Sequence, residues 1–103
     1  MEFKDKKVMV VGMAASGITA AMLLKKLGAQ VILYDAKPKD SFELSDVEEG
    51  CILRFGVDPC EVVREADMLV MSPGVPVKLP FVDLAKELNK PVIAEIELGY
   101  LTA

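Results

Sequence analysis

The stretch Lys7-Val8-Met9-Val10-Val11-Gly12 is an apolar run, rich in β-branched residues, that ends in a glycine. Residues Ser16 to Leu27 then follow a helical pattern, and Gly28 is placed to stop that helix. A second apolar run, Val31 to Tyr34, is closed by Asp35. The first 35 residues therefore predict a strand, a tight turn, a helix and a second, parallel strand.

The rest of the chain repeats this alternation of strand and helix. Further strands are predicted at Ile52–Phe55, Met68–Met71 and Pro91–Ala94, with helices at Asp58–Arg64 and Leu79–Leu88 and short helices at Phe42–Glu49 and within Glu95–Ala103. The strand segments are continuous apolar runs, as expected when both faces of a parallel sheet are covered. We therefore predict an α/β fold: a Rossmann-like, doubly wound, five-stranded parallel sheet with helices on both faces.

Length and composition limit the function classes. With 103 residues, 52% of them hydrophobic, the chain fits one domain, residues 1–103, which we expect to be the first domain of a longer polypeptide. The net charge is -4 and no cluster of lysine or arginine stands out, so neither nucleic acid nor a membrane surface is expected as a partner. No apolar stretch reaches the roughly 20 residues of a membrane span, and the charged start is unlike a secretion signal, which favours the cytoplasm.

The chain contains no histidine, and its only cysteines are Cys51 and Cys60. A Cys/His zinc site, a Cys-His nucleophile pair and the usual general base near neutral pH are therefore missing. Both cysteines are interpreted as reduced fillers, because free cysteine tends to behave as a small buried hydrophobe. We predict no catalytic residue and no metal ligand in this chain.

The segment Gly12-Met13-Ala14-Ala15-Ser16-Gly17 occupies the place of a dinucleotide fingerprint, between the first strand and the first helix. The middle glycine of that pattern is replaced by Ala14, so the motif is imperfect. The free amides at the start of the helix still attract an anion, and Ser16 offers a hydroxyl donor. The segment is thus a candidate diphosphate site. The alternative is that Gly12 and Gly17 only permit a tight turn and close packing.

Asp35 ends the second strand 18 residues after Gly17. Doubly wound domains use a carboxylate near this position to hold a nucleoside. The alternative is a turn-forming role before Ala36-Lys37-Pro38, because aspartate is common where strands end.

A third candidate, Ser72-Pro73-Gly74-Val75-Pro76, follows the strand at Met68–Met71. The two prolines stiffen this turn and Gly74 permits a positive φ, so the Ser72 hydroxyl is expected to be held in place for a ligand. The turns after the first, second and fourth strands should meet where the strand order reverses, and one elongated ligand would touch all three.

These residues together resemble the N-terminal domain of the Mur ligases, along essentially the whole chain. The matching motifs are Val10-Val11-Gly12 with Ser16-Gly17, Asp35, Ala66-Asp67, Ser72-Pro73-Gly74-Val75-Pro76 and Pro91-Val92-Ile93-Ala94-Glu95-Ile96-Glu97-Leu98. The resemblance is to the family member that adds D-glutamate to UDP-N-acetylmuramoyl-L-alanine in peptidoglycan precursor synthesis, an ATP-dependent amide-forming ligase.

The resemblance implies a role for each candidate residue. The backbone around Ala15 and Ser16 receives the diphosphate, Asp35 with Ala36-Lys37 holds the uracil, and Ser72-Pro73-Gly74 lines the substrate. Ala14 and Ala36 replace the commoner glycine and hydroxyl residue, which removes some room and one side-chain hydrogen bond.

The resemblance also implies what this chain lacks. A central domain of the parent enzyme binds ATP and magnesium, and D-glutamate enters only in the full-length enzyme. Because the chain has no Gly-x-x-x-x-Gly-Lys-[Ser/Thr] loop, it is expected to be inactive alone and to hold no cofactor.

Two other functions remain open at this point. An NAD(P)-binding domain of a dehydrogenase or a regulatory module shares the glycine turn and Asp35, but gives no reason for the turn at 72–76. A protein-interaction domain on the same scaffold is the second alternative, since fold does not fix function.

Overall fold

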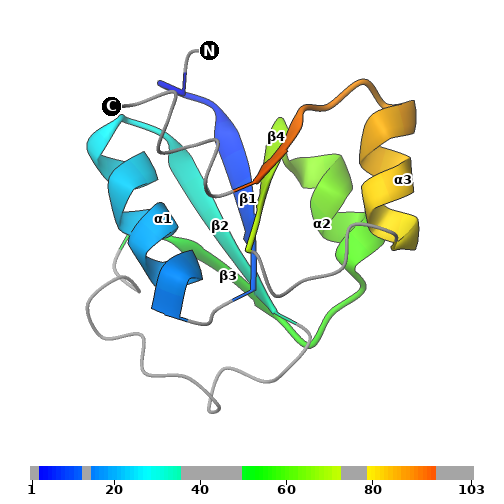
Figure 1. Ribbon diagram of the computed structural model, residues 1–103, viewed down its shortest axis with the longest axis horizontal. Coiled ribbons are helices and arrows are strands. Elements are labelled where there is room, and N and C mark those ends of the chain that lie inside the picture. Colours follow the sequence, from blue (N-terminus) through cyan, green and yellow to red (C-terminus); the bar gives the residue numbers. More distant parts are fainter. Residues whose placement is uncertain (1–2, 13–14, 36–49, 73–78, 95–103) are drawn as a thin grey trace.

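Five parallel strands form one sheet in the computed structural model, which describes residues 3–12, 15–35, 50–72 and 79–94 (Figure 1). The strands are β1 (Lys7–Val11), β2 (Gln30–Asp35), β3 (Ile52–Phe55), β4 (Met68–Met71) and β5 (Val92–Ala94). Their order is β3-β2-β1-β4-β5, and every neighbouring pair is parallel. The predicted doubly wound sheet is confirmed, with the reversal of strand order between β1 and β4.

Helices cover both faces of this sheet, as predicted. Helix α1 (Ala15–Lys26) lies on one face, and α2 (Pro59–Glu65) and α3 (Pro80–Glu87) lie on the other (Figure 1). These bounds differ from the predicted ones by one residue at each end. The short helices predicted at 42–49 and within 95–103 lie outside the described residues. No helix in the described ranges is long and apolar enough to cross a bilayer.

Local sequence signals explain where two of the helices begin and end. Gly28 has a φ of 85°, and the amides of Gly28 and Ala29 donate to the carbonyls of Lys25 and Leu24, which closes α1 with a Schellman motif. Asp58 is the N-cap of α2, where its carboxylate accepts a 2.9 Å hydrogen bond from the Cys60 amide and Pro59 occupies the first turn.

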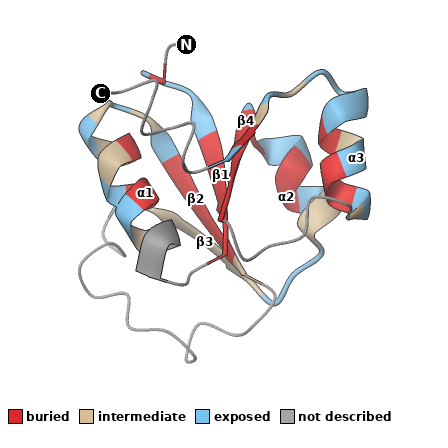
Figure 2. Cartoon of the chain, in the orientation of Figure 1, coloured by how far each residue is buried: buried red, intermediate tan, exposed pale blue. Residues whose placement is uncertain are grey.

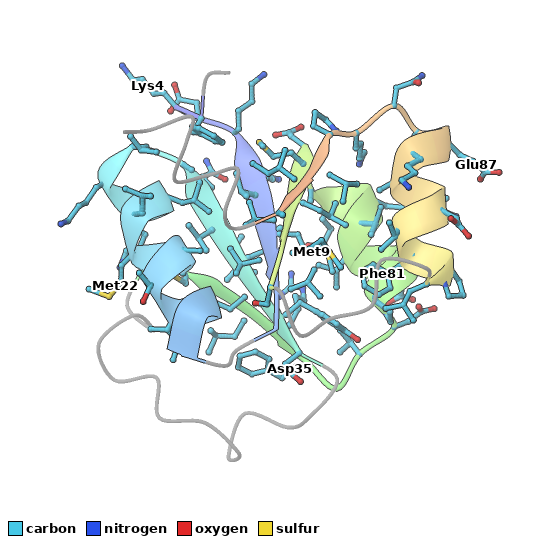
Figure 3. The ribbon with its side chains drawn as sticks, in the orientation of Figure 1. Lys4, Met9, Met22, Asp35, Phe81 and Glu87 are labelled. Carbon is cyan, nitrogen blue, oxygen red and sulfur yellow. The ribbon has the colours of Figure 1, made fainter. Side chains whose placement is uncertain are left out.

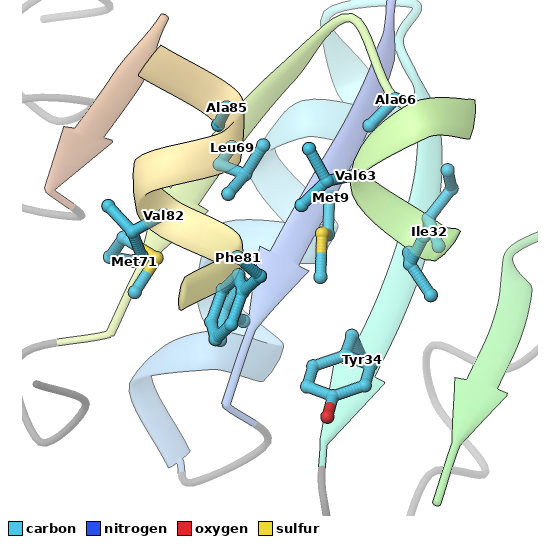
Figure 4. Packing of buried hydrophobic residues seen from close by; sticks show 12 residues of the cluster. Met9, Ile32, Tyr34, Val63, Ala66, Leu69, Met71, Phe81, Val82 and Ala85 are labelled. Atoms are coloured by element: carbon cyan, nitrogen blue, oxygen red, sulfur yellow. The ribbon is translucent and has the colours of Figure 1, made fainter. Parts of the chain in front are cut away.

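Strand β1 is buried on both faces, so it joins two hydrophobic clusters (Figure 2). Val8 and Val10 point into the cluster under α1, whereas Met9 and Val11 point into the cluster under α2 and α3. Figure 4 shows the second cluster, in which Phe81 of α3 packs towards the end of β1. This two-sided burial is why the strands read as continuous apolar runs rather than as alternating ones.

Asp67 fixes the register between β1 and β4. Its carboxylate accepts a 2.8 Å hydrogen bond from the Lys7 amide, and its own amide donates to the Lys7 carbonyl at 2.7 Å. Ala66, the preceding residue, is buried among the residues under α2. The Ala66-Asp67 pair is therefore explained by packing and strand pairing.

The two cysteines are free and half-buried. Cys51 packs against the cluster under α1, where burial raises the pKa of its thiol, and Cys60 packs against the cluster on the opposite face. Because the sheet separates them, they do not form a disulfide with each other.

Lys90 connects the end of α2 to the segment between α3 and β5. Its ammonium group donates to the carbonyls of Val63 at 2.7 Å, Arg64 at 3.2 Å and Ala66 at 2.5 Å. These carbonyls lie at the end of α2, where the helix runs out of its own donors, and the Val63 carbonyl also accepts from the Ala66 amide at 3.2 Å. One side chain thus caps α2 from a different part of the chain.

Lys90→Met is expected to lower the free energy of unfolding by about 1–3 kcal/mol, because partly buried carbonyls lose a charged donor. Urea unfolding followed by circular dichroism measures the change. Lys6→Met is the matched control, since Lys6 is exposed and only its backbone is hydrogen-bonded in the described structure. Equal urea midpoints for Lys90→Met and Lys6→Met would contradict the role of Lys90 in capping α2.

Candidate functional site

Three of the predicted site residues lie together at the carboxyl edge of the sheet. In the strand register Val11 is opposite both Tyr34 and Met71, so β1, β2 and β4 end at the same level. Gly12 follows β1, Asp35 is the last residue of β2, and Ser72 follows β4. The predicted convergence at the reversal of strand order is therefore confirmed for these three residues.

The other predicted positions divide into two groups. The backbone of Ala15, Ser16 and Gly17 forms the first turn of α1, which has no acidic residue there. The remaining predicted positions lie outside the described residues: Ala14, Ala36, Lys37, Pro73 and Gly74. The positive end of the α1 dipole and its first amides lie directly after the glycine turn, an arrangement that suits an anion.

Gly12 is held between two neighbouring strands. Its φ of 95° lies in the left-handed region, which favours glycine. Its amide donates to the Tyr34 carbonyl at 2.9 Å, and its carbonyl accepts a 3.2 Å hydrogen bond from the Ser72 hydroxyl. The peptide groups of Gly12 thus bridge β2 and β4, which fixes the direction in which the chain leaves β1.

Ser72 is the one buried polar residue of the described structure, with 6% of its surface exposed. Its amide extends the β1–β4 pairing by donating to the Val11 carbonyl at 3.2 Å. The Ser72 hydroxyl was predicted to be held in place, and the structure identifies the Gly12 carbonyl as its acceptor. Its contact with a ligand stays a prediction.

Asp35 is half-buried at the junction of β2 and β3. It is opposite Phe55 in the strand register, and its carbonyl accepts a 3.0 Å hydrogen bond from the Gly56 amide. The residue is thus part of the sheet rather than only of the turn that follows. Figure 3 shows Asp35 at the end of β2.

A pocket of about 440 Å³ opens beside Gly12 and Asp35, on the face covered by α2 and α3. It is lined by Val11, Gly12, Tyr34, Asp35, Asp58, Pro59, Cys60, Leu79, Pro80 and Phe81. The strand ends supply one wall, and the beginnings of α2 and α3 supply the other. Most of these side chains are apolar, which is typical of small-molecule sites.

The sequence prediction did not include the aromatic and helix-start residues of this pocket. Tyr34 and Phe81 form an aromatic pair with ring centroids 6.2 Å apart and planes tilted by 54°. Burial raises the pKa of the Tyr34 hydroxyl, and the charges of Asp35 and Asp58 act in the same direction. The sequence does signal that a helix begins at Asp58-Pro59. No rule of sequence spacing, however, predicts that this helix start lies beside β2.

The described part of the site combines three kinds of group. It offers amides at the start of α1, two carboxylates and an apolar pocket. In residues 3–12, 15–35, 50–72 and 79–94, no group of three or more histidine, cysteine or acidic residues is placed to hold a metal ion.

Comparison of the sequence with known families gives one assignment. Residues 6–94 match the family described as Mur ligase MurD-like, N-terminal domain. The chain is 46% identical over 102 residues to the UDP-N-acetylmuramoylalanine–D-glutamate ligase of Streptococcus mutans, covering 96% of this chain and 23% of that protein. It is 44% identical over 105 residues to the ligase of the same name from Enterococcus hirae, covering 97% of this chain and 22% of the relative. The chain thus spans less than a quarter of the length of these relatives.

Solved structures share the fold at lower identity. A pseudomurein peptide ligase type C from Methanothermus fervidus aligns with a TM-score of 0.65 and 24% identity, covering 86% of this chain and 19% of that one. Shikimate dehydrogenase from Aquifex aeolicus aligns with a TM-score of 0.63 and 18% identity, covering 91% of this chain and 44% of that one. At these identities the likeness concerns the fold alone.

Ser72→Ala is expected to lower the free energy of unfolding by about 1 kcal/mol, because the link between the β4 end and Gly12 is lost. Urea unfolding measures this change in the free energy of unfolding. Amide hydrogen exchange gives a second measurement: the Gly12 amide should lose protection, whereas the Leu69 amide, bonded to Pro91 on the far side of β4, should not. Unchanged protection at Gly12 would rule out this link as a determinant of the turn.

Proposed function

Because the chain belongs to the Mur ligases, as their MurD-like N-terminal domain, we propose that it binds UDP-N-acetylmuramoyl-L-alanine in a ligase that adds D-glutamate. The relatives named above carry this substrate and this amino acid in their names. Their ligase activity supports a role for the parent protein in peptidoglycan precursor synthesis.

The observation that carries the proposal is the meeting of Gly12, Asp35 and Ser72 at the reversal of strand order. Open parallel sheets bind ligands in the crevice beyond the carboxyl ends of their strands, at this reversal. In the proposed arrangement the diphosphate lies at the amides that open α1. The nucleoside lies towards Asp35, with Ala36 and Lys37 beside it, and the sugar and alanine extend along Ser72-Pro73-Gly74.

An acidic domain binds a diphosphate in this arrangement without a dedicated arginine. The net charge of -4 opposes an anion at long range, but salt screens exposed charges over about 10 Å. The first turn of α1 has amides that the helix itself gives no acceptor, the positive end of the helix dipole and no acidic residue. Local backbone donors therefore decide where the phosphates bind.

The amide-forming chemistry is proposed to lie outside this chain. The sequence contains no Gly-x-x-x-x-Gly-Lys-[Ser/Thr] loop for the phosphates of ATP, so its residues do not fit ATP with magnesium. We place ATP, Mg²⁺ and D-glutamate in the remainder of the longer protein. The role of this chain is to bind and orient the nucleotide end of the substrate.

UDP is expected to bind the chain at least about tenfold more tightly than NADH, the ligand of the rival dehydrogenase interpretation. Heteronuclear NMR titration up to millimolar ligand suits the weak binding expected when contacts from other domains are missing. Amides of residues 15–17 should shift first, because they face the diphosphate. Preferential binding of NADH would overturn the proposed function.

Gly12→Ala is expected to weaken UDP binding roughly tenfold, because a side chain at a φ of 95° strains the turn that aims α1. Gly56→Ala is the matched control. Gly56 also has a positive φ, 69°, and a Cβ built there meets no atom within 4 Å. Each variant should lose about 1–2 kcal/mol of stability, but only Gly12→Ala should lose affinity. Equal UDP affinities would show that Gly12 has only a structural role.

A further inference from the structure

The pocket beside Gly12 and Asp35 has one wall that is not part of the sheet. This wall is made by the beginnings of two helices: Asp58 to Cys60 at the start of α2, and Leu79 to Phe81 at the start of α3. Helix α2 has 7 residues, too few to be stable through its own hydrogen bonds, so its position depends on what it packs against. The groups that hold α2 in place therefore decide the shape of this wall.

Lys90 joins the far ends of these two helices. Its amide donates to the carbonyl of Ala85, in the last turn of α3, at 2.9 Å. Its ammonium donates to the carbonyls of Val63 at 2.7 Å and Ala66 at 2.5 Å, at the end of α2. The side chains of Val63, Ala66 and Ala85 belong to one hydrophobic cluster between these helices and the sheet (Figure 4). The two helices are thus fixed to each other at the ends that lie away from the pocket.

A second side-chain contact at this end of α2 is weaker. Arg54 of β3 and Glu65 of α2 form an ion pair with an N–O distance of 3.0 Å, and their side chains are 38% and 40% exposed. Exposed ion pairs contribute little, because water screens the charges and two long side chains lose freedom. The Lys90 ammonium is half-buried and donates to three carbonyls at the negative end of the α2 dipole, where a cation is favourable. Lys90 is therefore the stronger of these two anchors.

We propose that Lys90 is a positioning residue for the site, because it holds the starts of α2 and α3 at the spacing that a bound nucleotide requires. This assignment rests on the proposed function, since it takes UDP as the ligand. In this arrangement Lys90 does not touch the ligand, because it lies one helix length, about 10 Å, from Asp58 at the other end of α2. Lys90 acts through the orientation of α2, and loss of its hydrogen bonds lets the two helix starts move relative to each other.

The test compares Lys90→Met with the unaltered chain of 103 residues, at a temperature where circular dichroism shows both to be folded. Each is titrated with UDP and with inorganic pyrophosphate, and amide NMR shifts report binding. Lys90→Met should bind UDP about fivefold more weakly, because part of the binding energy then restores the spacing of the two helix starts. Pyrophosphate affinity should stay within about twofold, because its proposed site is on α1, which lies on the opposite face of the sheet from α2 and α3.

Hydrogen exchange of the unaltered chain tests the same coupling without a substitution. If the Lys90 contacts favour UDP binding, UDP stabilises those contacts by the same factor, because coupling between two sites is reciprocal. Saturating UDP should therefore slow the exchange of the Ala66 and Lys90 amides, which are hydrogen-bonded to α2 and α3, about fivefold. Saturating pyrophosphate should leave the exchange of both amides unchanged.

Two control variants separate positioning from a change of charge and from the loss of the other anchor. Lys86→Met removes the same charge from the last turn of α3, where the Lys86 side chain is exposed and makes no hydrogen bond among the described residues. Glu65→Gln removes the ion pair with Arg54 at the end of α2. Both variants should bind UDP within about twofold of the unaltered chain.

The possible failures are distinguishable. Unchanged UDP affinity in Lys90→Met, or unchanged exchange of the Ala66 amide when UDP is bound, overturns the positioning role and leaves the proposed function standing. An equal loss of UDP and pyrophosphate affinity in Lys90→Met also overturns it, because the effect then does not act through the pocket wall. If the unaltered chain does not bind UDP, the proposed function fails, and the positioning role fails with it.

Discussion

The burial of β1 on both faces is the constraint on which the rest of the structure depends. Val8 and Val10 pack under α1, while Met9 and Val11 pack under α2 and α3, so neither layer forms without this strand. Because β1 pairs in parallel with both β2 and β4, three strands end side by side at one edge. The central position of β1 thus brings the ends of three strands together at the edge where we propose that the ligand binds.

Gly12, which follows β1, links the packing of this strand to the site. Gly12 accepts from Ser72 and donates to Tyr34, so the turn is held by the two strands that flank β1. A left-handed φ at this point lets the chain leave the sheet and begin α1. The geometry that we propose for phosphate binding is therefore built from backbone groups, and their positions depend on the packing of the whole sheet.

In the proposed site, backbone amides and side chains face parts of the ligand that differ in charge. Backbone amides face the anionic part of the proposed ligand, where an acidic domain has no cluster of cationic side chains to offer. Apolar rings and two carboxylates line the pocket between the strand ends and the helix starts.

The sequence by itself determined the order of the described elements and their bounds to within one residue, because apolar runs, Gly28 and Asp58-Pro59 act over a few neighbouring residues. It also predicted Gly12, Asp35 and Ser72, since each directly follows or ends a strand. Only the tertiary structure decided that Tyr34, Asp58 and Phe81 share one pocket. These residues come from β2, from the start of α2 and from α3, and no local spacing couples them. Their proximity results from how the helices pack on the sheet, which is a property of the folded chain as a whole.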